Sequence, residues 1–120
     1  MKIAVTAQGQ RLDSGVNPRF GRAKWLVIYD LNNDTYEVME NRQNLEAAQG
    51  AGVQTASLIA SSGASAVLTG NVGPKAFKVL QAAGIKTYIG VSGTVEQAIT
   101  QYRTGSLVEA SSPNVEGHWM

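Results

Sequence analysis

A long, mainly basic segment separates the first two apolar runs of the chain. Residues 8–24 contain four cations, one acid, three glycines and the aromatic Phe20. Connections between strands usually have about two to five residues, so a connection of this length usually has a function or is disordered. Arginine side chains beside backbone N–H groups, which glycine leaves accessible, are suited to bind an anion. The alternative is a solvated loop whose Phe20 covers the end of a sheet, and composition alone does not separate the two.

Glycine-containing segments at the start of three predicted helices are the second kind of candidate. Residues 70–73 and 91–94 each follow a short strand and precede a helix, and residues 49–52 open another helix. The first turn of a helix presents N–H groups without intrahelical partners and a positive dipole end, which together attract anions. Glycine and threonine also occur in ordinary helix caps, but two such segments beside an arginine-bearing loop favour a binding site. A phosphate-binding P-loop is excluded, because the Lys-Ser/Thr ending is absent.

The elements that would position these residues follow from the hydrophobic pattern. Apolar runs predict strands at residues 2–6, 25–29, 35–40, 66–69 and 86–90, and helical spacing predicts helices at 47–62, 74–83 and 94–104. The order β-β-β-α-β-α-β-α predicts an α/β fold in which a mixed five-stranded sheet has helices on both faces. Ligands of such sheets usually bind beyond the carboxyl ends of the parallel strands.

The size and composition of the chain predict one globular domain. Its 120 residues are 43% hydrophobic and 16% charged, which is typical of a folded protein. We assign residues 1–107 to this domain and residues 108–120 to a flexible tail. No apolar run is long enough to cross a membrane and no signal peptide is evident, so we expect a cytoplasmic protein with no membrane partner. No basic helix or stacked-aromatic pattern predicts binding of nucleic acid.

Charge is unevenly distributed, although the formal net charge is only +1. Residues 1–24 contain five cations and one acid, whereas residues 25–49 contain five acids and one cation. Positive charge near the long loop attracts anions over a Debye length, about 8–10 Å.

The residue types needed for covalent catalysis or for a bare metal site are scarce. The chain has no cysteine, and His118, its one histidine, belongs to the predicted tail, so His118 is only a weak candidate metal ligand. No nucleophile therefore has an evident base, and we expect no catalysis. A nuclease of the ribonuclease-H-like type has the same architecture, but it needs carboxylates clustered at the sheet for its metal ions, and the first strand contains none.

Several segments resemble the dinitrogenase iron–molybdenum cofactor accessory proteins. The resemblance covers residues 1–107, and its most specific part is the Phe-Gly-Arg sequence within residues 17–23; the other matching segments are residues 1–6, 51–52, 70–74, 84–86 and 93–96. It implies a ribonuclease-H-like fold with three α/β/α layers. It also implies the binding, carriage or assembly of an anionic metal–sulfur cluster, without catalysis. The absence of cysteine and the opening Met-Lys-Ile-Ala-Val-Thr are most similar to members that bind a molybdenum–copper sulfide cluster.

Such a cluster contains its own sulfides, so it needs no protein thiolate and can be held non-covalently. The resemblance implies that Arg19 and Arg22 supply charge, that Phe20 and Val72 supply apolar contact, and that the helix openings supply N–H donors. The candidate binding residues are Arg11, Ser14, Asn17, Arg19, Phe20, Gly21 and Arg22 in the long loop, and Gly50, Gly52, Gly70, Asn71, Val72, Gly73, Ser92, Gly93 and Thr94 in the helix openings.

Two other functions use the same residues. A regulatory or scaffolding module would present the long loop to a protein partner and would need no small ligand. A protein partner is also expected for a cluster carrier, which would bind it when the cluster is delivered. A phosphate or nucleotide sensor would use the N–H groups of the helix openings.

Overall fold

The structure, a computed structural model, describes residues 1–41 and 50–114. The strands in this part of the chain are β1 (Lys2–Ala7), β2 (Trp25–Asp30), β3 (Thr35–Glu40), β4 (Ala64–Leu68) and β5 (Lys86–Tyr88). The helices are α1 (Ala51–Ser61), α2 (Pro74–Ala82), α3 (Val95–Arg103) and the short 3-10 helix η1 (Phe20–Arg22).

Strand β1 lies at the centre of a mixed five-stranded sheet with the order β3-β2-β1-β4-β5. It pairs antiparallel with β2, where Ala4 faces Ile28, and parallel with β4, where Ala4 faces Val67. Strands β2 and β3 are antiparallel, and β4 and β5 are parallel. The carboxyl ends of β1, β4 and β5 therefore lie at the same edge of the sheet, where the long connection begins.

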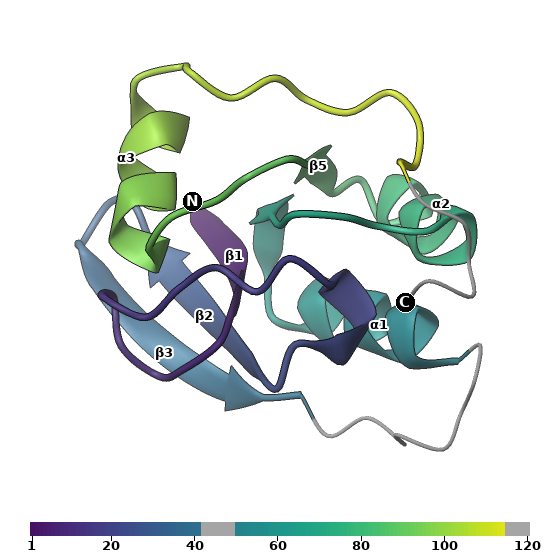
Figure 1. Ribbon diagram of the computed structural model, residues 1–120, viewed down its shortest axis with the longest axis horizontal. Helices are drawn as coiled ribbons and strands as arrows, with labels where there is room; N and C mark the ends of the chain where they lie inside the picture. The colour runs from purple at the N-terminus through teal and green to yellow at the C-terminus, as the bar shows by residue number, and fades with distance from the viewer. Residues whose placement is uncertain (42–49, 115–120) are drawn as a thin grey trace.

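Helices cover both faces of this sheet (Figure 1). Helices α1 and α2 pack on one face through buried residues such as Ile59 and Leu80, and α3 packs on the other face through Val95. The three layers confirm the predicted α/β fold, its mixed five-stranded sheet and its helices on both faces. The ribonuclease-H-like label agrees with this arrangement and still rests on the resemblance.

The helix ends are formed by the residues that the sequence pattern indicated. Pro74 occupies the first position of α2, where its missing N–H has no intrahelical partner to lose. Thr94 and Gln97 bond reciprocally in a capping box at the start of α3. Gly84, with a φ of +74°, follows α2 in a backbone conformation that other residues rarely adopt. The predicted helix 47–62 corresponds to α1; residues 47–49 lie outside the described part of the chain.

Part of the predicted tail lies along the edge of the sheet (Figure 1). Glu109 forms an antiparallel bridge with Tyr88 on β5, and the Ala110 N–H donates to the Thr87 carbonyl oxygen at 2.8 Å. These contacts form because β5 is an edge strand whose outer backbone groups accept another segment. The flexibility of residues 108–120 stays a prediction. In residues 1–41 and 50–114 no helix has the length and apolar character needed to span a membrane.

Candidate anion-binding site

The long connection between β1 and β2 is divided into two lobes. Residues 8–15, here called the first lobe, are closed at their base by a 2.8 Å hydrogen bond from the Gln8 N–H to the Gly15 carbonyl oxygen and by the adjacent bridge between Ala7 and Val16. Residues 16–24, the second lobe, pass over the carboxyl ends of β1 and β4 and include η1. The candidate residues of the loop are therefore not all in one place.

The start of the second lobe is fixed to β1 and β4 by a buried hydroxyl pair. The Asn17 N–H donates to the Thr6 carbonyl oxygen at 2.7 Å, and the Thr6 hydroxyl bonds the Asn17 carbonyl oxygen at 2.9 Å. Thr6 Oγ1 also lies 2.8 Å from Thr69 Oγ1, and both threonines are completely buried. Each threonine follows an apolar run at the carboxyl end of its strand, and the two strands are neighbours in the sheet. This position is the sequence signal that could have identified them.

The end of the second lobe is fixed to α1 by Asn41, which sequence analysis did not identify. The Asn41 Nδ2 group donates to the Ala23 carbonyl oxygen at 2.7 Å and to Thr55 Oγ1 at 2.8 Å. Asn41 is only 5% exposed, and the Thr55 hydroxyl in turn donates to the Ala51 carbonyl oxygen at 2.9 Å. A single polar residue after a strand gives no sequence signal for such a role. The network holds Ala23, which follows η1, beside the first turns of α1.

Phe20 and Val72 belong to the hydrophobic core. Both side chains are 0% exposed and pack in the same cluster as residues from α1 and α2. In this conformation neither side chain reaches the surface, and the expectation that they contact a ligand stays a prediction. The burial of Phe20 against residues of the sheet agrees with the alternative interpretation, in which its side chain covers the end of the sheet.

Arg19, Arg22 and Asn71 form what we call the arginine site. Arg19 and Asn71 are bridged by two backbone hydrogen bonds, from the Asn71 N–H to the Pro18 carbonyl oxygen (2.8 Å) and from the Phe20 N–H to the Asn71 carbonyl oxygen (3.2 Å). Arg19 is exposed and Arg22 is half-buried. The neighbouring segments η1, α1, residues 70–73 and α2 contain no Asp or Glu. The site therefore combines two guanidinium groups with four described segments, namely η1, α1, residues 70–73 and α2, that contain no carboxylate side chain.

Most candidate residues of the second lobe and of two helix openings gather around this site. Asn17 lies beside it, since the Asn17 side-chain oxygen accepts from the Arg19 N–H at 3.0 Å. Gly21 is buried within η1, and α1, which Gly50 precedes, packs against η1. The remaining members of the group, in α1 and in the loop after β4, are Gly52, Gly70 and Gly73.

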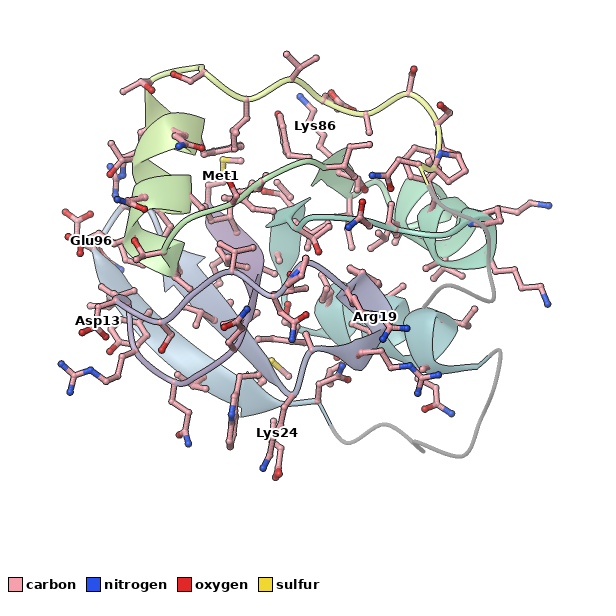
Figure 2. The ribbon with its side chains drawn as sticks, in the orientation of Figure 1. Met1, Asp13, Arg19, Lys24, Lys86 and Glu96 are labelled. Atoms are coloured by element: carbon pink, nitrogen blue, oxygen red, sulfur yellow. The ribbon has the colours of Figure 1, made fainter. Side chains whose placement is uncertain are left out.

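Arg11 lies apart from the other two arginines. The Arg11 Nε group is 3.0 Å from Asp13 Oδ1, and both side chains are largely exposed. Arg11 and Asp13 line a hollow of about 410 Å³ together with Glu96 and Tyr36. Figure 2 shows Asp13 and Glu96 together on one side of the molecule and Arg19 away from them. Arg11 therefore belongs to a mixed-charge surface, and the long loop does not bring its three arginines together.

The opening of α3 is already occupied by the first lobe. The Val95 N–H donates to the Ser14 carbonyl oxygen and the Glu96 N–H to the Leu12 carbonyl oxygen, both at 2.8 Å. The adjoining hollow, of about 640 Å³, includes two carboxylates; its lining residues are Asp13, Ser92, Gly93, Thr94, Glu96, Gln97, Thr100 and Gln101. Because these donors are used and the carboxylates repel anions, the surface around Ser14, Ser92, Gly93 and Thr94 is less favourable for an anion than the arginine site.

Gly70 allows the second lobe to approach β4 closely. A Cβ atom at Gly70 would lie 2.6 Å from the Pro18 Cα atom and 2.7 Å from the Pro18 carbonyl oxygen, which are backbone atoms. We expect Gly70→Ala to push the lobe away and to lower the free energy of unfolding by about 1–3 kcal/mol. Denaturant unfolding measures the loss.

The matched control for this substitution is Gly15→Ala. A Cβ atom there would lie 3.2 Å from the side-chain oxygen of Gln8, which can move aside. This variant should change the free energy of unfolding by about 0.5 kcal/mol or less. Equal losses in the two variants would show that the contact with Pro18 is not the cause.

The groups with shifted pKa values in the described part of the chain lie outside the arginine site. A backbone hydrogen bond from Asn32 lowers the pKa of Asp30 in the turn between β2 and β3. Burial raises the pKa of Tyr102 on α3, and burial also raises that of Tyr29 on β2. The electrostatics of the arginine site therefore rest on the charge of its two guanidinium groups.

The described residues suit a metal cluster that brings its own ligands. Within residues 1–41 and 50–114 no group of three or more His, Cys, Asp or Glu side chains could hold a metal ion. His118 lies outside this part of the chain. What the arginine site offers is charge and hydrogen-bond donors, which fit the outer sulfide surface of an anionic cluster.

Comparison with known proteins identifies the family. The sequence profile of the family described as "Dinitrogenase iron-molybdenum cofactor" matches residues 1–105. The chain therefore belongs to the dinitrogenase iron–molybdenum cofactor family, as its motifs predicted.

Individual relatives agree with this assignment. The apo form of the orange protein from Desulfovibrio gigas has a similar structure, with a TM-score of 0.92 and 44% identity over 95% of this chain and 96% of that one. A putative NifB protein from Thermotoga is 33% identical, with a TM-score of 0.79 over 97% of this chain and 98% of the other. An uncharacterized protein of Methanocaldococcus jannaschii is 33% identical over 110 residues, 89% of each chain.

Proposed function

We propose that this protein binds and carries an anionic molybdenum–copper sulfide cluster, without catalysis and without covalent attachment, at the arginine site. The observation that supports this most is that Arg22 ends η1 and Arg19 directly precedes it, while α1, residues 70–73 and α2 contain no Asp or Glu. Membership of a family named for a metal cofactor, and similarity to the orange protein, support the same proposal.

The chemistry of arginine suits this kind of cargo. A guanidinium group is planar, permanently charged and more weakly hydrated than an ammonium group, so it loses less hydration when it meets a large anion. Arg19 precedes η1 with an extended backbone and Arg22 is the last residue of η1, so the two arginines lie at the two ends of one three-residue helix. Together they can contact a dianion from adjacent directions.

The rigid attachment of the second lobe favours affinity. Hydrogen bonds to Thr6 and Asn71 hold one end of the lobe, and Asn41 holds the other. The complete burial of Phe20 fixes the middle. Because the backbone that carries both arginines is already ordered, binding costs less conformational entropy. We infer that this lobe is a wall of the site and not a lid.

Reconstitution tests the proposed function. Apo-protein mixed with tetrathiomolybdate and copper is expected to leave a desalting column with new visible absorption and with a molybdenum-to-protein ratio that stays constant as loading increases. The same mixture without protein is the control. Protein that leaves the column colourless at every loading would overturn the proposal.

The two alternative functions are distinguished by the ligand used. Calorimetry with phosphate and with ATP, compared with tetrathiomolybdate, separates a cluster carrier from a nucleotide sensor, since a sensor binds ATP more tightly than the thiometallate. Capture of a protein partner that requires no added metal would instead support a regulatory module.

A further inference from the structure

The loop after β4 has a hydrogen-bonding partner from the C-terminal segment. The Asn114 side-chain oxygen accepts from the Val72 N–H at 2.8 Å, and the Asn114 N–H donates to the Val72 carbonyl oxygen at 3.2 Å. The Asn114 Nδ2 group donates to Asn71 Oδ1 at 2.9 Å and to the Gly70 carbonyl oxygen at 3.3 Å. One residue thus makes four hydrogen bonds to three consecutive residues of this loop.

Asn114 occupies a donor that an anion at this helix opening would use. The Val72 N–H precedes α2 and is one of the donors that the sequence assigns to a ligand. Because an N–H group makes one strong hydrogen bond, the Asn114 oxygen and an acceptor atom of an anion exclude each other there. The arginine site is coupled to this contact through Asn71, whose Nδ2 group donates to the Pro18 carbonyl oxygen at 3.0 Å while its Oδ1 atom accepts from Asn114.

The C-terminal segment is weakly attached elsewhere. Val108, just before it, is 82% exposed, and Glu109, Ser111 and Ser112 are exposed as well. Of residues 109–114, only Ala110 and Pro113 are half-buried. A segment with few apolar contacts and solvent-exposed hydrogen bonds opens at a small cost in free energy, far below that of global unfolding.

We propose that residues 109–114 form a displaceable clasp, in which Asn114 holds the loop after β4 closed and competes with an anion for the Val72 N–H. The existence of the clasp stands on the hydrogen bonds above; the identity of the anion rests on the proposed function. The apparent affinity for the anion equals the affinity of the open form multiplied by the fraction of molecules whose clasp is open. Weakening the clasp should therefore tighten binding, although it removes contacts.

Amide hydrogen exchange of the apo-protein tests the clasp itself. Asn114→Ala removes the three side-chain hydrogen bonds, so we expect the Ala110 amide, which bonds β5 four residues away, to exchange about 10-fold faster or more. Ser112→Ala is the matched control, since Ser112 is exposed and forms no hydrogen bond within the described part of the chain. Acceleration of Val72 alone, with Ala110 unchanged, would overturn the clasp.

Titration with tetrathiomolybdate tests the competition. We expect Asn114→Ala to bind it about 5- to 50-fold more tightly than the unmodified protein, and Ser112→Ala to bind it equally. Equal or weaker binding by Asn114→Ala would show that Asn114 does not oppose the anion. If no form of the protein binds the anion, the proposed function and the competition both fail, while the exchange of Ala110 still decides whether the clasp exists.

Discussion

Replacing Arg19 and Arg22 together by alanine is expected to weaken binding of tetrathiomolybdate with copper by about 10- to 100-fold. Each guanidinium contributes a charge-assisted hydrogen bond, and partial exposure limits its contribution to roughly 1 kcal/mol. Loss of both gives the expected factor, since about 1.4 kcal/mol corresponds to a tenfold change in affinity. Titration followed by visible absorption measures the change.

Arg11→Ala is the matched control for the double variant. Arg11 has the same side chain in the same connection, but it lies in the first lobe against Asp13. We expect it to leave the affinity within about twofold, because an exposed arginine that pairs with Asp13 in the other lobe contributes little to an anion bound at the arginine site. Salt should weaken the binding of the unmodified protein and not that of the double variant. An equal loss of affinity from Arg11→Ala would move the site to the first lobe.

Phe20→Ala is expected to lower the free energy of unfolding by about 3–5 kcal/mol. The side chain is 0% exposed and packs between the sheet and α1, so its removal loses buried apolar surface and leaves a cavity. Chemical denaturation, followed by the fluorescence of Trp25 in β2, measures the loss. A change below about 1 kcal/mol would contradict the assignment of Phe20 to the core.

Phe20→Leu separates support of the core from contact with the ligand. Leucine retains much of the apolar volume, so we expect a loss of about 1–2 kcal/mol and a largely folded protein. Its affinity for the thiometallate should equal that of the unmodified protein. A folded Phe20→Leu variant with strongly reduced affinity would instead place the ring against the cluster.

The elements of this fold could be predicted because their signals are local. The alternation of Thr35–Glu40, the proline at position 74 and the pair formed by Thr94 and Gln97 each act over a few residues, and the structure confirms all three. The 3-10 helix η1 was not predicted, since its conformation depends on the packing of Phe20 beneath it. Short irregular elements of this kind are decided by tertiary contacts.

The candidate site could be predicted only in part. Sequence proximity grouped Arg11 with Arg19, yet the bond between Gln8 and Gly15 folds residues 8–15 into a separate lobe. Sequence analysis also offered the opening of α3 as a donor site, but the carbonyl oxygens of the first lobe already accept its N–H groups. The first outcome depends on a hydrogen bond between residues seven positions apart, and the second on contacts between residues more than eighty positions apart. Helix and strand periodicity gives no signal for either.

The sequence by itself determined the family, the order of the strands and helices, and the lack of cysteine that restricts how a cluster can be held. Only the tertiary structure decided that Arg11 lies in a separate lobe from Arg19 and Arg22, that Phe20 is buried in the core, and that Asn114 bonds the loop after β4. The physical reason is that periodicity and helix caps depend on neighbours within a turn or two. The path of the chain brings Pro18 to Asn71 and Asn114 to Val72, and this path is fixed only when the whole core packs.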